Sequence, residues 1–266
     1  MKRYYAILMG LMLFTSFGFA QTAITLAEGA KVGVYVSYGS LKASGNFVDN
    51  ACLTYDGNGG WNSATELRWK DTDSEANFYA YTPFVADIKD ALGFVAEIQS
   101  DQTTKDAQTA SDFLWGKGIN RPNDGKPQFS LKHMFSKLVV TIVPGDGITE
   151  DELNDGSLSV RIKNVRTKTR VRLHDGRMDA LDDLATIKTF QERPLTFSAV
   201  LVPQGEEQMK VVIVWNNTEY PVSIGKSFGQ GRLYHLTATV KKIAGGINVS
   251  IGGWGDTGED YGGTVN

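Results

Sequence analysis

The sequence predicts an all-β protein composed of two tandem antiparallel β-sandwich domains. Apolar and polar residues alternate with a period of two along many segments, as in strands that place one face on a core and the other in water. A dozen or more such segments are separated by turns rich in Gly, Asn, Asp and Pro. This spacing fits two sandwiches better than one sheet.

The strongest strand predictions follow from this alternation. Residues 32–37, 158–163 and 169–174 are each expected to place their apolar residues on a core and the intervening residues in water. Residues 211–215 are apolar on both faces, which indicates a central strand. A long strand is expected at 233–240, and a last short one at 247–251.

A hairpin is predicted directly after the central strand. Asn216 and Asn217 tolerate positive φ and connect that strand to a second one that begins at Thr218. Pro221 confines the second strand to a sheet edge, because proline cannot donate a hydrogen bond to a neighbouring strand.

Helix signals are few. Thr149 and Glu152 have the spacing of a capping box and predict one helical turn, which Gly156 ends. Residues 87–92 and 179–184 are candidates for one further turn each.

The first twenty residues have the composition of a secretory signal peptide. Lys2 and Arg3 form a positive n-region, residues 6–17 form the apolar core, and residues 18–20 form a small-x-small cleavage site. The apolar run is too short for a membrane-spanning helix, which needs about 20 residues. We therefore predict a cleaved signal peptide at 1–20, an exported mature protein and no transmembrane segment after cleavage.

The mature chain is expected to divide into an N-terminal domain at 21–147 and a C-terminal domain at 148–266. Residues 144–156 are rich in turn formers and acidic residues, and they mark the clearest change of composition. The polar loop at 118–128 is the alternative boundary.

Composition limits the partners and the chemistry. Without Lys2 and Arg3 the mature chain has 25 basic and 30 acidic side chains, a net charge of −5, which argues against nucleic-acid binding. The one cysteine, Cys52, lies in an apolar run and cannot form an internal disulfide. A buried thiol is its expected role, and intermolecular pairing is the alternative.

No catalytic motif is found in the sequence. Gly-x-Ser-x-Gly, His-Glu-x-x-His, Cys-x-x-Cys and a phosphate-binding Gly-rich loop are all missing, and the three histidines lie on separate predicted strands. Asp71, Asp73 and Glu75 have the spacing of cation ligands but lack the glycine and distal glutamate of a calcium loop. We expect no catalytic residue, no metal site and no cofactor.

Several segments in a fixed order carry a family likeness. Residues 111–115 are "SDFLW", and residues 129–142 follow the pattern "F-x-x-K-H-x-x-S-K-L-V-V-T-I". "FYAYTPF" at 78–84, "AVLVPQ" at 199–204 and a glycine-rich end around Trp254 accompany them. The chain thus resembles the fimbrillin (Mfa-like) family, the type V pilus subunits and related surface proteins of Gram-negative anaerobes.

The resemblance implies two transthyretin- or immunoglobulin-like sandwiches that build or decorate surface fibres, and not an enzyme. It also implies a structural role for the residues of the family motifs. These residues are Ser111, Asp112, Phe113, His133, Lys137, Pro203 and Gln204.

Type V pilins that resemble this chain polymerise after proteolysis removes an N-terminal strand, because a strand of the next subunit then fills the groove. Relatives are cleaved after arginine, but the mature chain has no arginine before Arg68. Lys31 and Lys42 are therefore the candidate processing sites. Many relatives also carry a lipoprotein cysteine directly after the signal, whereas residues 21–23 are Gln-Thr-Ala here, so no lipid anchor is expected.

A basic cluster lies between residues 161 and 177, where Asp175 is the one acidic residue. If residues 164–167 form a hairpin, the outward side chains of its two strands make one positive patch. Protection of an edge strand is the simpler explanation, and contact with an acidic subunit surface or an anionic glycan is the alternative. The cluster comprises Arg161, Lys163, Arg166, Lys168, Arg170, Arg172 and Arg177.

The tryptophans raise a carbohydrate-stacking hypothesis. Trp61, Trp69, Trp115 and Trp215 sit beside apolar strand residues and are expected in the core. Trp254 is flanked by glycines and is expected to be partly exposed, or docked on a neighbouring subunit.

Two hypotheses about function remain. The first is a non-enzymatic structural subunit or accessory tip adhesin of type V pili at the cell surface, fimbrium or outer membrane. Its expected partners are other fimbrial subunits, bound by β-strand addition. A host glycan or a host protein is a further candidate partner. The second is an exported carbohydrate-binding β-sandwich module.

Overall fold

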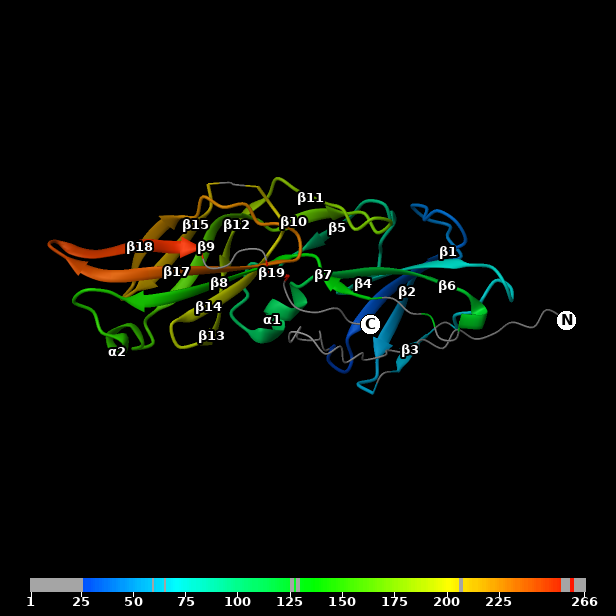
Figure 1. Ribbon diagram of the computed structural model, residues 1–266, viewed down its shortest axis with the longest axis horizontal. Coiled ribbons are helices and arrows are strands. Elements are labelled where there is room, and N and C mark those ends of the chain that lie inside the picture. The colour runs from blue at the N-terminus through cyan, green and yellow to red at the C-terminus, as the bar shows by residue number, and fades with distance from the viewer. Residues whose placement is uncertain are drawn as a thin grey trace.

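The computed structural model describes residues 26–254 and 259–260, apart from residues 59, 65, 125–126, 128–129 and 206–207. The signal peptide predicted at 1–20 lies outside the described residues. Within them strands far outweigh helices, and the strands form an elongated molecule with the N-terminal sheet at one end (Figure 1). The predicted class, all-β with tandem antiparallel sheets, is confirmed.

The N-terminal sheet has six strands in the order β3-β2-β1-β4-β6-β7, and each neighbouring pair is antiparallel. Its strands are β1 (Lys31–Ser37), β2 (Val48–Tyr55), β3 (Trp61–Ser63), β4 (Ala76–Thr82), β6 (Leu114–Asn120) and β7 (Lys132–His133). β1 lies inside this sheet, between β2 and β4.

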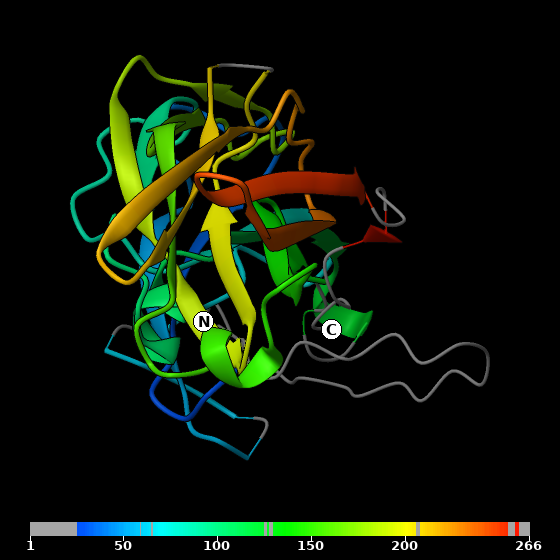
Figure 2. The same cartoon turned by 90° about the vertical axis from the view of Figure 1, so that its left-hand side faces the viewer.

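The C-terminal half is a sandwich of two sheets. One has the order β12-β9-β15-β16, from β9 (Ser159–Arg166), β12 (Leu184–Lys188), β15 (Lys210–Trp215) and β16 (Thr218–Ser223). The other has the order β13-β14-β8-β17-β18, from β8 (Ser136–Pro144), β13 (Phe190–Arg193), β14 (Thr196–Leu201), β17 (Arg232–Ile243) and β18 (Gly246–Trp254). β19 (Glu259–Asp260) also pairs with β17. Figure 2 looks along the molecule from this end.

A small third layer connects the halves. The sheet β11-β10-β5 joins β5 (Phe94–Glu97) of the first half to β10 (Lys168–Val171) and β11 (Met178–Ala180) of the second. The short helices of the described residues are α1 (Lys105–Ala110), η1 (Pro122–Asp124) and α2 (Glu150–Leu153).

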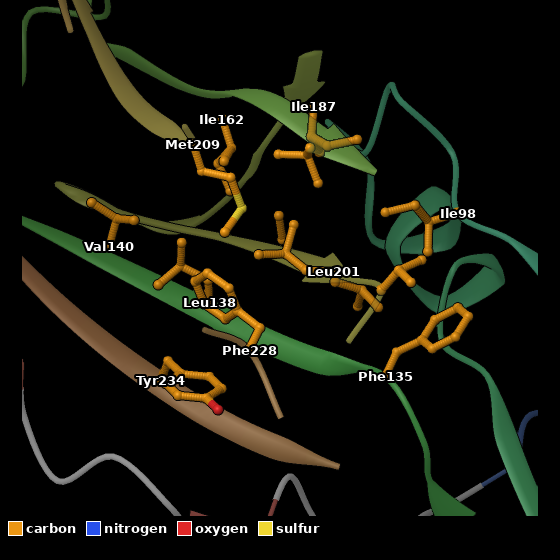
Figure 3. Close-up of a cluster of buried hydrophobic side chains, with 14 of the residues drawn as sticks. Ile98, Phe135, Leu138, Val140, Ile162, Ile187, Leu201, Met209, Phe228 and Tyr234 are labelled. Atoms are coloured by element: carbon orange, nitrogen blue, oxygen red, sulfur yellow. The ribbon is translucent and has the colours of Figure 1, made fainter. Parts of the chain in front are cut away.

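One hydrophobic core runs through the sandwich and continues to the inner face of the N-terminal sheet. Figure 3 shows its centre, where Ile162 and Ile187 of one sheet lie opposite Leu138, Val140 and Leu201 of the other. A second, smaller cluster covers the outer face of the N-terminal sheet and includes Val32, Val34, Val36, Phe78 and Leu114.

Several local predictions are confirmed. Asn216 and Asn217 both have positive φ (48° and 60°) and connect β15 to β16, and β16 with Pro221 is an edge strand. Thr149 and Glu152 form a capping box at the start of α2: the Glu152 N–H donates to Thr149 Oγ1, and the Thr149 N–H to Glu152 Oε2 (3.3 and 2.8 Å).

Other predictions are wrong. Residues 87–92 contain no helix, and residues 179–184 fall partly in β11 and β12. Cys52 is half-buried rather than buried. β1 does not have a face in water, because Tyr35 and Ser37 pack inward while the valines pack outward, and all are at most 4 % exposed.

The division into domains remains a proposal. β8 precedes the boundary expected at 147, yet it pairs with β14 and β17, which follow that boundary. We propose that the chain divides at the β7–β8 connection, near residues 134–135.

Candidate functional site

The candidate functional site is the position of β1 within the N-terminal sheet. β1 pairs with β2 from Lys31 to Val36 and with β4 from Gly33 to Ser37, so both of its edges are hydrogen-bonded. Its removal would expose two strand edges at once and uncover apolar residues on both faces of the sheet.

The inner face of β1 is anchored by Tyr35. This side chain is 1 % exposed and belongs to the main core. Burial raises the pKa of the Tyr35 hydroxyl, and the carboxylates of Asp49 and Asp90 raise it further. The ring is therefore a neutral, buried aromatic group at physiological pH.

The two predicted processing residues flank this strand. Lys31 is the first residue of β1 and is exposed. Lys42 is exposed in the β1–β2 connection, where its N–H donates to Asn46 Oδ1 (2.9 Å) and its carbonyl accepts from Asn46 Nδ2 (3.0 Å). A cut after Lys42 would break the covalent connection between β1 and the strands that follow it.

The first group of family-motif residues joins α1 to the N-terminal sheet. Ser111 is buried; its hydroxyl donates to the Ala107 carbonyl (2.8 Å) and accepts from the Gln99 N–H (2.9 Å). Phe113 packs among aromatic rings of the core. Asp112 Oδ2 lies 2.7 Å from His133 Nδ1, which connects the end of α1 to β7.

The remaining motif residues lie in the C-terminal half. Lys137 Nζ lies 2.6 Å from Glu192 Oε1, connecting β8 to the edge strand β13. Gln204 Oε1 accepts from the Arg166 N–H (3.0 Å), and its amide donates to the Val202 carbonyl (2.9 Å). Pro203 lies between Val202 and Gln204 in the sequence. These contacts are compatible with structural roles.

The predicted hairpin through residues 164–167 is wrong, and so is the single positive patch that depended on it. β9 pairs with β12 and β15, whereas β10 pairs with β5 and β11, so the two strands belong to different sheets. The basic cluster is therefore spread over separate surfaces. Its residues are Arg161, Lys163, Arg166, Lys168, Arg170, Arg172 and Arg177.

Acidic side chains, most of them from other segments, also pair with six of the seven cations of this basic cluster. Arg161 and Lys163 both contact Glu219 of β16 (3.3 and 2.7 Å). The other ion pairs are Arg166 with Asp182, Lys168 with Glu97 and Asp183, Arg172 with Asp179, and Arg177 with Asp175. The sequence could not show Glu219, Glu97 and Asp179 as partners because they lie on other strands that come near the cluster only in the folded chain.

The tryptophans are mostly core residues. Trp69, Trp115 and Trp215 are buried, while Trp61 is half-buried against Tyr55 on the neighbouring strand. Trp254 is the last residue of β18, and its backbone pairs with Leu236. The predicted exposure of its side chain lies outside what the structure describes.

Sequence reasoning missed three buried side chains with specific contacts, of which Tyr81 belongs to the site and Gln102 and Gln108 contact β14. Tyr81 packs against β1, Gln102 bonds to both backbone groups of Val200, and Gln108 bonds to Ser198. Tyr81 lies within the "FYAYTPF" segment, which was the one signal available. Among the described residues, no group of three metal-ligating side chains is close enough to hold an ion. No helix in that part of the chain is long and apolar enough to cross a membrane.

The fold defines the class of protein first: an all-β chain of tandem sheets that are antiparallel apart from the β8–β17 pair. Within this class, the model of the fimbrillin-like family matches residues 20–254, and the chain belongs to that family. The family indicates an exported surface protein with a structural role at fimbriae. A search of curated protein sequences found no match.

Solved structures share the fold. A candidate cell adhesion protein from Bacteroides uniformis superposes with a TM-score of 0.74 at 19% identity, covering 97% of this chain and 98% of that one. A second from Bacteroides ovatus gives a TM-score of 0.70 at 18% identity, covering 96% and 98%. A fimbrial protein from Bacteroides ovatus gives 0.51 at 15% identity, covering 82% of this chain and 46% of that one.

Proposed function

We propose that this protein is a structural subunit or accessory tip adhesin of a type V pilus, assembled by exchange of the strand at the β1 position. The observation that carries the proposal is β1 itself. It is an interior strand at the start of the described chain, hydrogen-bonded on both edges and buried on both faces. A strand from a neighbouring subunit could reproduce all of these contacts.

Magnitudes explain why the resident strand must leave first. The four large apolar side chains of β1 contribute roughly 6–12 kcal/mol at about 1.5–3 each. Ordering its seven residues costs roughly 7–14 kcal/mol at about 1–2 each. A free strand therefore gains little on balance and cannot displace β1 while β1 is covalently attached. Proteolysis removes that covalent advantage.

Lys42 is the preferred processing site in this proposal. It lies in a connection rather than in a strand, and it is exposed, whereas Lys31 is hydrogen-bonded in β1. Cleavage after Lys42 would leave residues 26–42 attached only by noncovalent contacts. The incoming strand would then compete with β1 on equal terms.

Limited proteolysis with trypsin tests the proposal. We expect cleavage after Lys42 to be followed by ladders of oligomers on a gel without denaturant. Lys42→Gln should prevent both, whereas Lys89→Gln, the same change at another exposed lysine, should prevent neither. A cleaved product that stays monomeric would contradict assembly by strand exchange. Electron microscopy of cells with and without the gene then separates shaft subunits, whose loss removes fibres, from accessory subunits.

One observation favours the second hypothesis, a carbohydrate-binding module. Tyr55 and Trp61 form a half-buried aromatic pair at the edge of the N-terminal sheet, with ring centroids 5.3 Å apart. Collisional quenching of tryptophan fluorescence distinguishes the hypotheses. A glycan that protects Trp61 from quenching would support the binding module, and lack of protection by host glycans would leave the structural role.

A further inference from the structure

One position of β1 is closed to every residue except glycine. A Cβ atom built on Gly33 would lie 2.2 Å from Tyr81 Cε1 and 2.4 Å from Tyr81 Cζ, far inside any van der Waals contact. The Tyr81 ring therefore occupies the space in which a side chain of β1 would otherwise stand. Gly33 and Tyr81 are also direct partners in the β1–β4 pairing.

Tyr81 cannot move aside. Its side chain is fully buried, with its ring centroid 5.3 Å from that of Phe94 and 6.0 Å from that of Phe113. Its hydroxyl donates to Asn50 Oδ1 (2.7 Å) and accepts from the Val85 N–H (3.3 Å). The ring is thus held by apolar contacts at one edge and by hydrogen bonds at its hydroxyl. It cannot shift to remove the steric overlap with a larger residue at position 33.

We propose that Tyr81 is the specificity-determining residue of the β1 position, because it requires a glycine in any strand that occupies this position. The inference rests on the proposed function, in which a strand of another subunit replaces β1. A single obligatory glycine would also fix the register. A shift by one residue exchanges the two faces of the strand, and a shift by two places Lys31 or Tyr35 against Tyr81.

The neighbouring contacts extend this requirement. Two residues after Gly33, on the same face, Tyr35 fills a buried aromatic site. One residue before it, Val32 enters the outer cluster. Val34, one residue after it, is fully buried in the same cluster. The strand that fits is therefore an apolar residue, a glycine, a second apolar residue and then an aromatic residue.

Peptide binding tests the glycine requirement. A protease site inserted between the exposed residues Gly39 and Ser40 allows β1 to be cut, removed in denaturant and replaced by a labelled peptide of residues 29–38 during refolding. The peptide with Gly33→Ala should bind at least about tenfold more weakly than the native peptide. Tyr81→Phe keeps the ring and should keep this difference, whereas Tyr81→Leu should reduce it.

Two outcomes would contradict the proposal in different ways. Equal binding of the native and Gly33→Ala peptides would overturn the glycine requirement and leave strand exchange standing. If even the native β1 peptide failed to restore the fold, the proposed function would fall with this inference.

Discussion

Glu192 is the residue at which charge and burial compete most clearly. Burial disfavours its ionised form, but hydrogen bonds from Lys137 and from the Ser198 hydroxyl outweigh this effect and lower its pKa. Ser198 in turn accepts from Gln108 Nε2 (2.8 Å). Strands β8, β13 and β14 and helix α1 are therefore connected through one carboxylate.

The pH dependence of stability should report this carboxylate. A pKa lowered in the folded state gives stability that is present above the unfolded value near 4.5 and is lost as pH falls through the folded value. We expect Glu192→Gln to cost roughly 1 kcal/mol at pH 7, a figure discounted for solvent screening, and to converge on the wild type once the pH falls below the lowered folded-state pKa. Urea unfolding at several pH values measures this.

The partner residue supplies the control for that measurement. Lys137→Met should remove a similar pH-dependent part of the stability, because the ammonium group is one of the two donors that lower the pKa. A constant difference between Glu192→Gln and the wild type from pH 7 to pH 3 would show that the carboxylate charge contributes nothing.

Gly33→Ala in the intact chain should destabilise the fold by about 3 kcal/mol, because the new methyl group has no room beside Tyr81. Gly205→Ala is the matched control, since nothing lies within 4 Å of its Cβ position. That change should cost little or even stabilise slightly by restricting the unfolded chain. Equal midpoints of urea unfolding for the two variants would contradict the close contact.

At the scale of elements, the sequence predicts what neighbouring residues decide. The β15–β16 hairpin was predictable because Asn216 and Asn217 by themselves provide the two positive φ angles of its turn. The hairpin expected at residues 164–167 fails although Asn164 also has a positive φ (60°). There β9 pairs with β12 and β15, and β10 pairs with β5 and β11. The local sequence around residues 164–167 does not show this pairing.

The same distinction applies to the candidate site. Lys31 and Lys42 could be proposed from the sequence because they are the two basic residues between residue 21 and Arg68. Tyr81 could not, since nothing in "FYAYTPF" tells which tyrosine lies over a glycine of another strand. Alternation predicted that β1 is half-exposed, because periodicity does not show that a second cluster covers the outer face of the sheet.

Residues 94–111 form the element that joins the halves, and Gln102 is its anchor. Its side chain is fully buried; its amide donates to the Val200 carbonyl (2.9 Å) and its carbonyl accepts from the Val200 N–H (2.8 Å). Gln102→Ala would leave both backbone groups without these partners, so we expect a loss of about 2–4 kcal/mol. Gln99→Ala, the same change at an exposed position, should cost less than about 0.5 kcal/mol.

Hydrogen exchange locates the effect of the Gln102 change. The Lys188 N–H donates to the Ser100 carbonyl, and the Gln102 N–H donates to the Lys188 carbonyl (2.8 and 3.0 Å). Both amides should exchange faster in Gln102→Ala than in the wild type, relative to amides in the centre of β15. Unchanged protection at residues 102 and 188 would show that the segment is held by other contacts.

At the scale of the whole molecule, strands from both halves share one core. β5 pairs with β10, and the main hydrophobic cluster extends from Tyr35 and Tyr81 to Val211 and Leu236. Such continuity predicts a single cooperative unfolding transition rather than one for each half. Calorimetry should show one peak whose calorimetric and van't Hoff enthalpies agree, and two separated peaks would contradict this coupling.

The parallel pairing of β8 with β17 has a consequence for how the chain matures. Synthesis delivers residues 136–144 long before residues 232–240, and residues 145–231 must emerge between them. Until β17 has been synthesised, β8 can pair with β14 on one edge only. Its other edge and its apolar residues Leu138, Val140 and Ile142 are then open to incorrect pairing with another strand. The central β8–β17 pair of the C-terminal sheet can form only when the chain is nearly complete. Folding of this half is therefore a late event, and a chaperone or the secretion machinery would have to keep the chain unfolded until then.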